Sequence, residues 1–115
     1  MKTWESVPVI KNERKAIEDA ASMLKAQFPV EKVILFGSKV RGTYDKYSDI
    51  DLLVITSRVL NWKEEKAASG ILFDIGLKYD VIFSPLFIFI GEWEGDMFTG
   101  FPIYQEIIKD GAVVA

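Results

Sequence analysis

Apolar runs broken by turn residues predict three strands in this chain. Val33 to Phe36 is a short apolar run that Gly37 and Ser38 end, which predicts a buried strand followed by a turn. A second strand is expected from Asp49 to Ile55, and a third from Tyr79 to Ser84. A helical segment separates the second strand from the third, and this is the crossover expected in an α/β or α+β sheet.

Two long segments carry apolar residues at helical spacing. The first spans residues 12–28, with Asn12 as its expected N-cap and with Glu13 among the charged residues that we assign to a solvent-exposed face. The second spans residues 61–78 and begins with residues placed as a capping box. Both helices should pack on the sheet through their apolar stripes.

The C-terminal part of the chain contains a dense apolar stretch, a last helix and a short strand. A helix is expected from Pro102 to a C-cap at Gly111, followed by an edge strand at residues 112–114. Residues 86–93 have two interpretations. They form core or a final strand, or they form a partner-binding surface, because large exposed apolar patches mark interfaces.

Composition limits the architecture and the chemistry. The chain has 115 residues and 50% hydrophobic content, so we expect one domain over residues 1–115. A net charge of -3 argues against direct binding of nucleic acid. The absence of cysteine and histidine excludes disulfides, zinc thiolate sites and Ser-His triads. With no signal peptide and no apolar run that could span a bilayer, the sequence favours a cytoplasmic protein without membrane contact.

Two aspartates at the head of the second strand are the first candidate for chemistry. Side chains alternate along a strand, so Asp49 and Asp51 project from the same face. Two neighbouring carboxylates repel each other where burial makes charge costly, and they suit a hard cation such as Mg²⁺. The alternative is that both lie at a solvated strand end.

The turn before these aspartates has the residues of a phosphate site. Gly37 permits close approach of the backbone to a ligand, and Ser38 offers an N–H group and a hydroxyl. A helical turn at residues 39–42 would add free N–H groups, and Arg41 a guanidinium suited to phosphate. Residues 32–48, which precede the two aspartates, contain one acidic residue, Asp45, and four basic residues: Lys32, Lys39, Arg41 and Lys46. An ordinary strand-ending turn is the alternative.

The combined pattern resembles a known family. Gly37-Ser38-x-x-Arg41-Gly42, followed by Ser48-Asp49-Ile50-Asp51-Leu52, resembles the signature of the minimal nucleotidyltransferases, a branch of the DNA polymerase beta-like nucleotidyltransferase superfamily. The resemblance implies an α+β, two-layer fold with a small mixed sheet and helices packed on one face. It also implies that the Gly-Ser turn holds the triphosphate of ATP or another nucleoside triphosphate.

The same resemblance implies the metal ligands and the reaction. In that family the paired aspartates bind two Mg²⁺ ions, and a third carboxylate on a later strand completes the site. Chain order assigns this third role to Asp80, so Asp49, Asp51 and Asp80 are the expected catalytic and metal-binding residues. Gly37, Ser38 and Arg41 are the expected nucleotide-binding residues. An acceptor hydroxyl would displace pyrophosphate from the α phosphate, with Asp80 available to take the proton.

Several acceptors and roles stay open. Relatives of this type are commonly antitoxins that transfer AMP to a tyrosine of a HEPN-domain toxin, which makes such a toxin the expected partner. The residues would equally suit transfer to a small molecule. They also allow a non-catalytic antitoxin that binds nucleotide, or a partner-binding subunit, and a homo-oligomer is possible.

Overall fold

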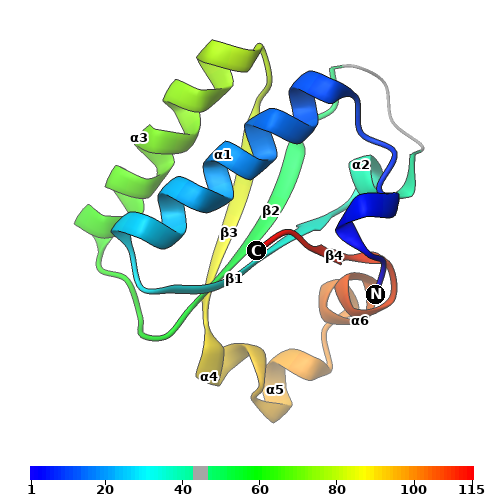
Figure 1. Ribbon diagram of the computed structural model, residues 1–115. Helices are drawn as coiled ribbons and strands as arrows, with labels where there is room; N and C mark the ends of the chain where they lie inside the picture. Colours follow the sequence, from blue (N-terminus) through cyan, green and yellow to red (C-terminus); the bar gives the residue numbers. More distant parts are fainter. Residues whose placement is uncertain (43–46) are drawn as a thin grey trace.

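The computed structural model describes residues 1–42 and 47–115 and contains a mixed sheet in the order β3-β2-β1-β4 (Figure 1). Strand β1 is antiparallel to both of its neighbours, β2 and β4, and β2 is parallel to β3. The strands are β1 (Val30–Phe36), β2 (Ile50–Thr56), β3 (Phe83–Phe89) and β4 (Ala112–Val113). The predicted edge strand after the last helix is therefore confirmed.

Helices lie on both faces of this sheet. The long helices α1 (Lys11–Gln27) and α3 (Trp62–Tyr79) cover one face (Figure 1). The other face packs against part of the C-terminal helices, α4 (Ile90–Trp93), α5 (Asp96–Thr99) and α6 (Pro102–Asp110). A 3-10 turn, η1 (Trp4–Ser6), precedes α1, and the short α2 (Ser38–Arg41) follows β1. The predicted α+β fold is confirmed, with the difference that helices are not confined to one face.

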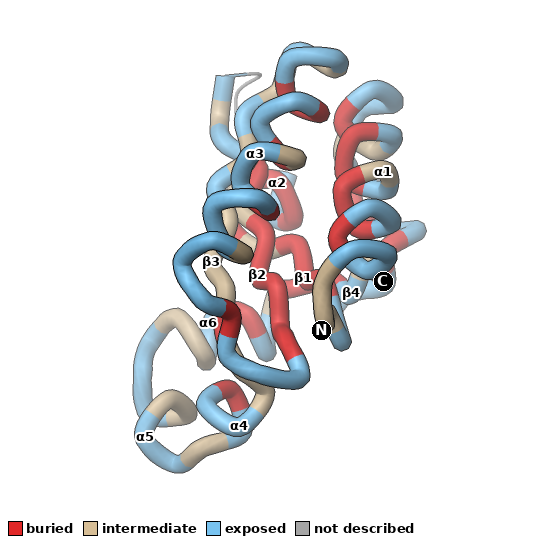
Figure 2. Tube along the Cα trace, turned by 90° about the vertical axis from the view of Figure 1, so that its left-hand side faces the viewer, coloured by how far each residue is buried: buried red, intermediate tan, exposed pale blue. Residues whose placement is uncertain are grey.

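Alternation along β2 divides the core into two parts. Leu52 and Val54 face α1 and α3, where small residues of α1 let the helix approach the sheet. Leu53 and Ile55 face the opposite side and pack against a cluster that includes Ile107 of α6. Figure 2 shows the buried positions along β2 and on the inner sides of α1 and α3. Asp51 lies two residues before Leu53 in β2, so its side chain points to the same face of the sheet, the face that packs against α6.

The predicted start of the third strand is wrong. Helix α3 continues through Tyr79, and Asp80 ends it as a C-cap in the left-handed conformation, with φ 57° and ψ 49°. The Asp80 N–H group donates to the carbonyl of Gly76. Tyr79, the expected first residue of the strand, is the last residue of the helix. Strand β3 therefore starts only at Phe83, three residues after Asp80.

The stretch 86–93 forms core, as the first of its two interpretations had it. Its first half completes β3, and its second half forms α4. Ile88 and Trp93 are buried, and the Trp93 ring packs on Tyr104 of α6 with centroids 4.6 Å apart. Within residues 1–42 and 47–115, no helix combines the length and apolar character needed to cross a bilayer.

Candidate active site

The turn between β1 and α2 lies directly against the second aspartate of the pair. Phe36, the last residue of β1, pairs with Asp51 in the sheet, which brings Gly37 beside the Asp51 side chain. Gly37 has φ 78° and ψ -158°, a backbone region that is essentially restricted to glycine. A Cβ atom at this position would overlap Asp51 Oδ2 and lie 3.2 Å from Asp51 Cγ. The glycine is therefore required both by the turn and by the carboxylate.

The two aspartates lie together at the head of β2, as predicted. Asp49 is exposed just before the strand, and Asp51 is half-buried within it. Burial raises the pKa of Asp51, and the charges of Asp49 and Glu106 raise it further, against a smaller opposing effect of Arg41. The pair is thus an anionic centre whose ionised form is costly, and a cation bound there would offset that cost.

Arg41 lies next to this centre but is held by an acid that the sequence did not reveal. Its Nη1 donates to Oε1 of Glu106 on α6 at 2.7 Å. Both side chains are more than a third exposed, so the ion pair can be exchanged for another anion with little loss. Glu106 lies 65 residues from Arg41 in the chain, and no local pattern announces their meeting.

Two charged residues are buried together: Glu13, which was predicted on a solvent-exposed face, and Lys39, which was counted in the positive charge beside the aspartates. Glu13 is 3% exposed and Lys39 is 1% exposed, and Lys39 Nζ donates to Glu13 Oε2 at 2.5 Å. A second oxygen of Glu13 accepts from the Ile10 N–H group at the start of α1, so Glu13 rather than Asn12 caps this helix. The Lys39 charge is thus committed to α1 and does not face a phosphate. Lys46 and Asp45, also counted in the sequence, lie outside the described residues.

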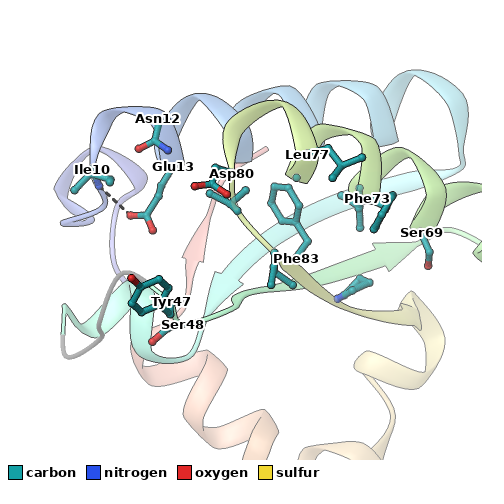
Figure 3. A pocket seen from close by; sticks show the side chains of 15 residues that line it. Ile10, Asn12, Glu13, Tyr47, Ser48, Ser69, Phe73, Leu77, Asp80 and Phe83 are labelled. Carbon is teal, nitrogen blue, oxygen red and sulfur yellow. Dashed lines mark hydrogen bonds between the residues drawn. The ribbon is translucent and has the colours of Figure 1, made fainter.

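The structure does not bring Asp80 to the other two aspartates. Asp80 caps α3 in the helix layer, where the neighbouring Tyr79 carbonyl accepts from Asn12 of α1 at 3.0 Å. Figure 3 shows Asp80 near the start of α1, whereas Asp51 belongs to the face of α6. In the part of the chain that is described, no three acidic side chains meet as a metal site. The β3 residue that pairs with Asp51 is Ser84.

A cavity of about 900 Å³ opens beside the helix layer (Figure 3). Its walls come from the start of α1, the second half of α3 and the edge strand β3. Phe73, Leu77, Ile82 and Phe83 make much of this wall apolar, while Asp80 and Ser48 lie at its polar end. Among the residues that the structure describes, no lysine or arginine lines it, so these residues alone do not suit a triphosphate.

Comparisons with known proteins agree with the motif. The sequence profile of a family described as nucleotidyltransferase domain matches residues 14–109. A candidate protein adenylyltransferase of Methanocaldococcus jannaschii is 37% identical over 82 residues, which cover 71% of this chain and 78% of that protein. A second such protein of the same organism is 46% identical over 46 residues, covering 38% of this chain and 46% of its own length.

Solved structures share the fold at low identity. A toxin-antitoxin complex with AMP-PNP contains a chain that matches with a TM-score of 0.60 at 15% identity, covering 92% of this chain and 73% of that one. A complex of tri-AMPylated Shewanella oneidensis HEPN toxin with MNT antitoxin matches with a TM-score of 0.54 at 15% identity, covering 89% and 71%. A candidate nucleotidyltransferase of Sulfolobus solfataricus matches with a TM-score of 0.56 at 19% identity, covering 92% and 88%.

Proposed function

This chain belongs to the nucleotidyltransferase domain family, and from that premise we propose that it transfers AMP from ATP to a hydroxyl group of a partner protein, a tyrosine of a HEPN-domain toxin. The observation that carries the proposal is the contact between the Gly37 turn and Asp51, with Asp49 and Arg41 beside it. Relatives named as protein adenylyltransferases support a protein acceptor. A structural neighbour that contains an AMPylated HEPN toxin supports this kind of partner.

The residues at the head of β2 fit one Mg²⁺ ion. Asp49 and Asp51 supply two carboxylates, the oxygen ligands that this cation prefers, at a point where their own charges oppose each other. Bound there, Mg²⁺ supplies electrostatic stabilisation of the charge that develops on the phosphate oxygens. A second ion would need a further carboxylate, and among the described residues no third acid joins the pair as a metal site. We therefore propose a site for one ion held by this chain alone.

The remaining residues position the nucleotide. The backbone at Gly37 can approach the β and γ phosphates closely because it carries no side chain, and Ser38 adds a hydroxyl donor. Arg41 exchanges the Glu106 carboxylate for a phosphate oxygen, while the buried pair of Glu13 and Lys39 fixes α2 against α1. The acceptor oxygen then bonds to the α phosphorus, the bond to the β phosphate breaks, pyrophosphate leaves, and the hydroxyl proton is released.

A second function is favoured by one specific observation. Because no three acidic side chains among the described residues meet as a metal site, the site suits nucleotide binding better than it suits metal-assisted transfer. In this alternative the chain acts as a nucleotide-binding antitoxin that inhibits its partner by occlusion, without modifying it.

Incubation with α-labelled ATP, Mg²⁺ and a HEPN toxin from the same genome separates the two functions. Transfer predicts a labelled toxin band that disappears with Asp49→Asn and Asp51→Asn but persists with Glu31→Gln, an exposed acid on β1 far from the turn. If all of these variants neutralise the toxin without labelling it, occlusion is the function. Failure to bind ATP in the presence of Mg²⁺ would contradict both.

A further inference from the structure

Helix α3 has a second apolar face that points away from the protein. Its inner face packs through Ala68 and Leu72, which are buried. On the outer side, Trp62, Phe73 and Leu77 are 68%, 67% and 69% exposed. A helix that is apolar on opposite sides is normally covered on both. Figure 2 colours these positions of α3 as exposed, so the described residues leave their side chains largely uncovered.

The residues of this outer face follow a symmetric order along the helix. At 100° per residue they fall within about 100° of the circumference, so they form a single stripe. The stripe consists of Trp62, Lys66, Ser69, Gly70, Phe73 and Leu77. Each member on one side of the midpoint between Ser69 and Gly70 has a counterpart at the same distance on the other side. Figure 3 shows Ser69, Phe73 and Leu77 along one side of α3.

We propose that this stripe binds a second copy of the same chain, with the two α3 helices antiparallel about a two-fold axis between Ser69 and Gly70. In that arrangement Trp62 meets Leu77 of the second copy, and Phe73 meets the aliphatic part of its Lys66. Such a two-fold contact requires a surface that is complementary to itself. The order of residues in the stripe meets this requirement when the helices run in opposite directions, whereas a parallel pair would place Lys66 against its own copy.

The centre of the stripe allows two helices to approach closely. Ser69 is small, and a Cβ atom added at Gly70 would meet no other atom within 4 Å, so the backbone there is open to a neighbour. Small residues at a crossing point let helix backbones come together, while large residues on either side fill the space between them. The glycine costs α3 about 1 kcal/mol of helix propensity, and close packing at an interface would explain its presence.

Charges beside the stripe favour the same antiparallel arrangement. Lys63 and Asp74 lie on the same side of the stripe, one in each half of α3. In the antiparallel pair Lys63 comes within about one turn of Asp74 of the second copy, whereas a parallel two-fold pair would place these two residues on opposite sides of the interface. Lys78, in the same half as Asp74, lies over the Tyr79 ring at 5.1 Å from its centroid.

The cavity beside α3 offers a place for the exposed tryptophan. Phe73, Leu77 and Ile82 line it, and Ile82 is itself 65% exposed. In the antiparallel pair Trp62 of the second copy lies level with Leu77, at the rim of this cavity. Because one helix and a cavity rim give less contact than the roughly 800 Å² per partner of a standard interface, we expect a dimer that dissociates on dilution.

Sedimentation velocity over a range of concentrations tests the proposal with the full chain. We expect a monomer at low concentration and a dimer at high concentration. Phe73→Asp should weaken association by roughly tenfold or more, because it places a charge in the stripe. Met97→Ser, which removes an apolar side chain that is 83% exposed on α5, should leave association unchanged.

A charge exchange tests the orientation of the two helices. Lys63→Glu alone and Asp74→Lys alone should each weaken the dimer, because each places like charges together across the axis. The double variant should recover much of the loss, which a misfolded protein could not do. A monomer at every concentration, a dimer that Phe73→Asp does not weaken, or a double variant as weak as the single ones would each overturn the proposal.

Discussion

Replacement of Gly37 by alanine is the sharpest perturbation of the proposed site. The backbone at Gly37, with φ 78° and ψ -158°, costs a residue with a side chain about 1–3 kcal/mol. The new methyl group would also overlap Asp51 Oδ2, so the carboxylate or the turn must move. We therefore expect Gly37→Ala to lower the free energy of unfolding by about 2 kcal/mol or more, and to weaken binding of ATP with Mg²⁺.

Gly42→Ala is the matched control for this substitution. Gly42 also has a positive φ, 73°, but a Cβ atom there would meet Pro8 at 3.1 Å and would not reach Asp51. This variant should lose about 1 kcal/mol of stability for its left-handed conformation and keep its nucleotide affinity. Comparison of the two variants separates backbone strain from damage to the site.

Urea denaturation and isothermal titration with ATP and Mg²⁺ measure the two effects. We expect both variants to lose stability and only Gly37→Ala to lose affinity. If Gly37→Ala binds nucleotide as the unaltered protein does, the turn is not the phosphate site, and the contact with Asp51 has only a structural role.

Three further predictions concern the other charged residues. Asp80→Gly should raise stability by about 0.5–1 kcal/mol, because glycine prefers its left-handed conformation, and should leave AMP transfer intact; loss of transfer would show that Asp80 takes part after all. Glu13→Gln should cost about 3 kcal/mol or more in urea denaturation, because Lys39 keeps a buried charge without that carboxylate, and a cost below about 1 kcal/mol would contradict the buried pair. Burial and then Asp49 raise the pKa of Asp51, so its ionised form costs stability at neutral pH, and that cost shrinks as pH falls below the raised pKa toward the ordinary value of 3.8. Without Mg²⁺, Asp51→Asn should therefore melt above the unaltered protein at pH 7, with a difference that shrinks in acid.

Glu106 of α6 is a charged residue beside Arg41 and Asp51 that the sequence motif does not include. Glu106 forms an ion pair with Arg41, which makes the Arg41 guanidinium less available to a phosphate. Glu106 also adds negative charge near Asp51, which strengthens the attraction of that carboxylate for a cation. In the proposed function, nucleotide with Mg²⁺ would satisfy both, because it would bring phosphate to Arg41 and positive charge to Asp51. The C-terminal helix therefore belongs to the site, although it carries no residue of the recognised signature.

The sequence alone determined the features that depend on neighbours in the chain. The Gly37 turn, the adjacent aspartates of β2 and the Asn61 capping box of α3 arise from residues within a few positions of one another. Backbone conformation and strand alternation act over that range, so their spacing in the chain is enough to predict them. The family resemblance depended on the same short stretch.

Only the tertiary structure decided which distant residues meet at the site and which do not. Glu13 and Lys39, 26 positions apart, are buried together because the fold brings the first turn of α1 to α2, and Glu106 reaches Arg41 because α6 covers the opposite face of the sheet. Asp80 was expected in a strand, but α3 ends at Tyr79, one residue beyond its expected end, and Asp80 is its C-cap in the helix layer. The length of a helix and the face that it covers depend on packing free energy summed over the whole core, which no local stretch of sequence contains.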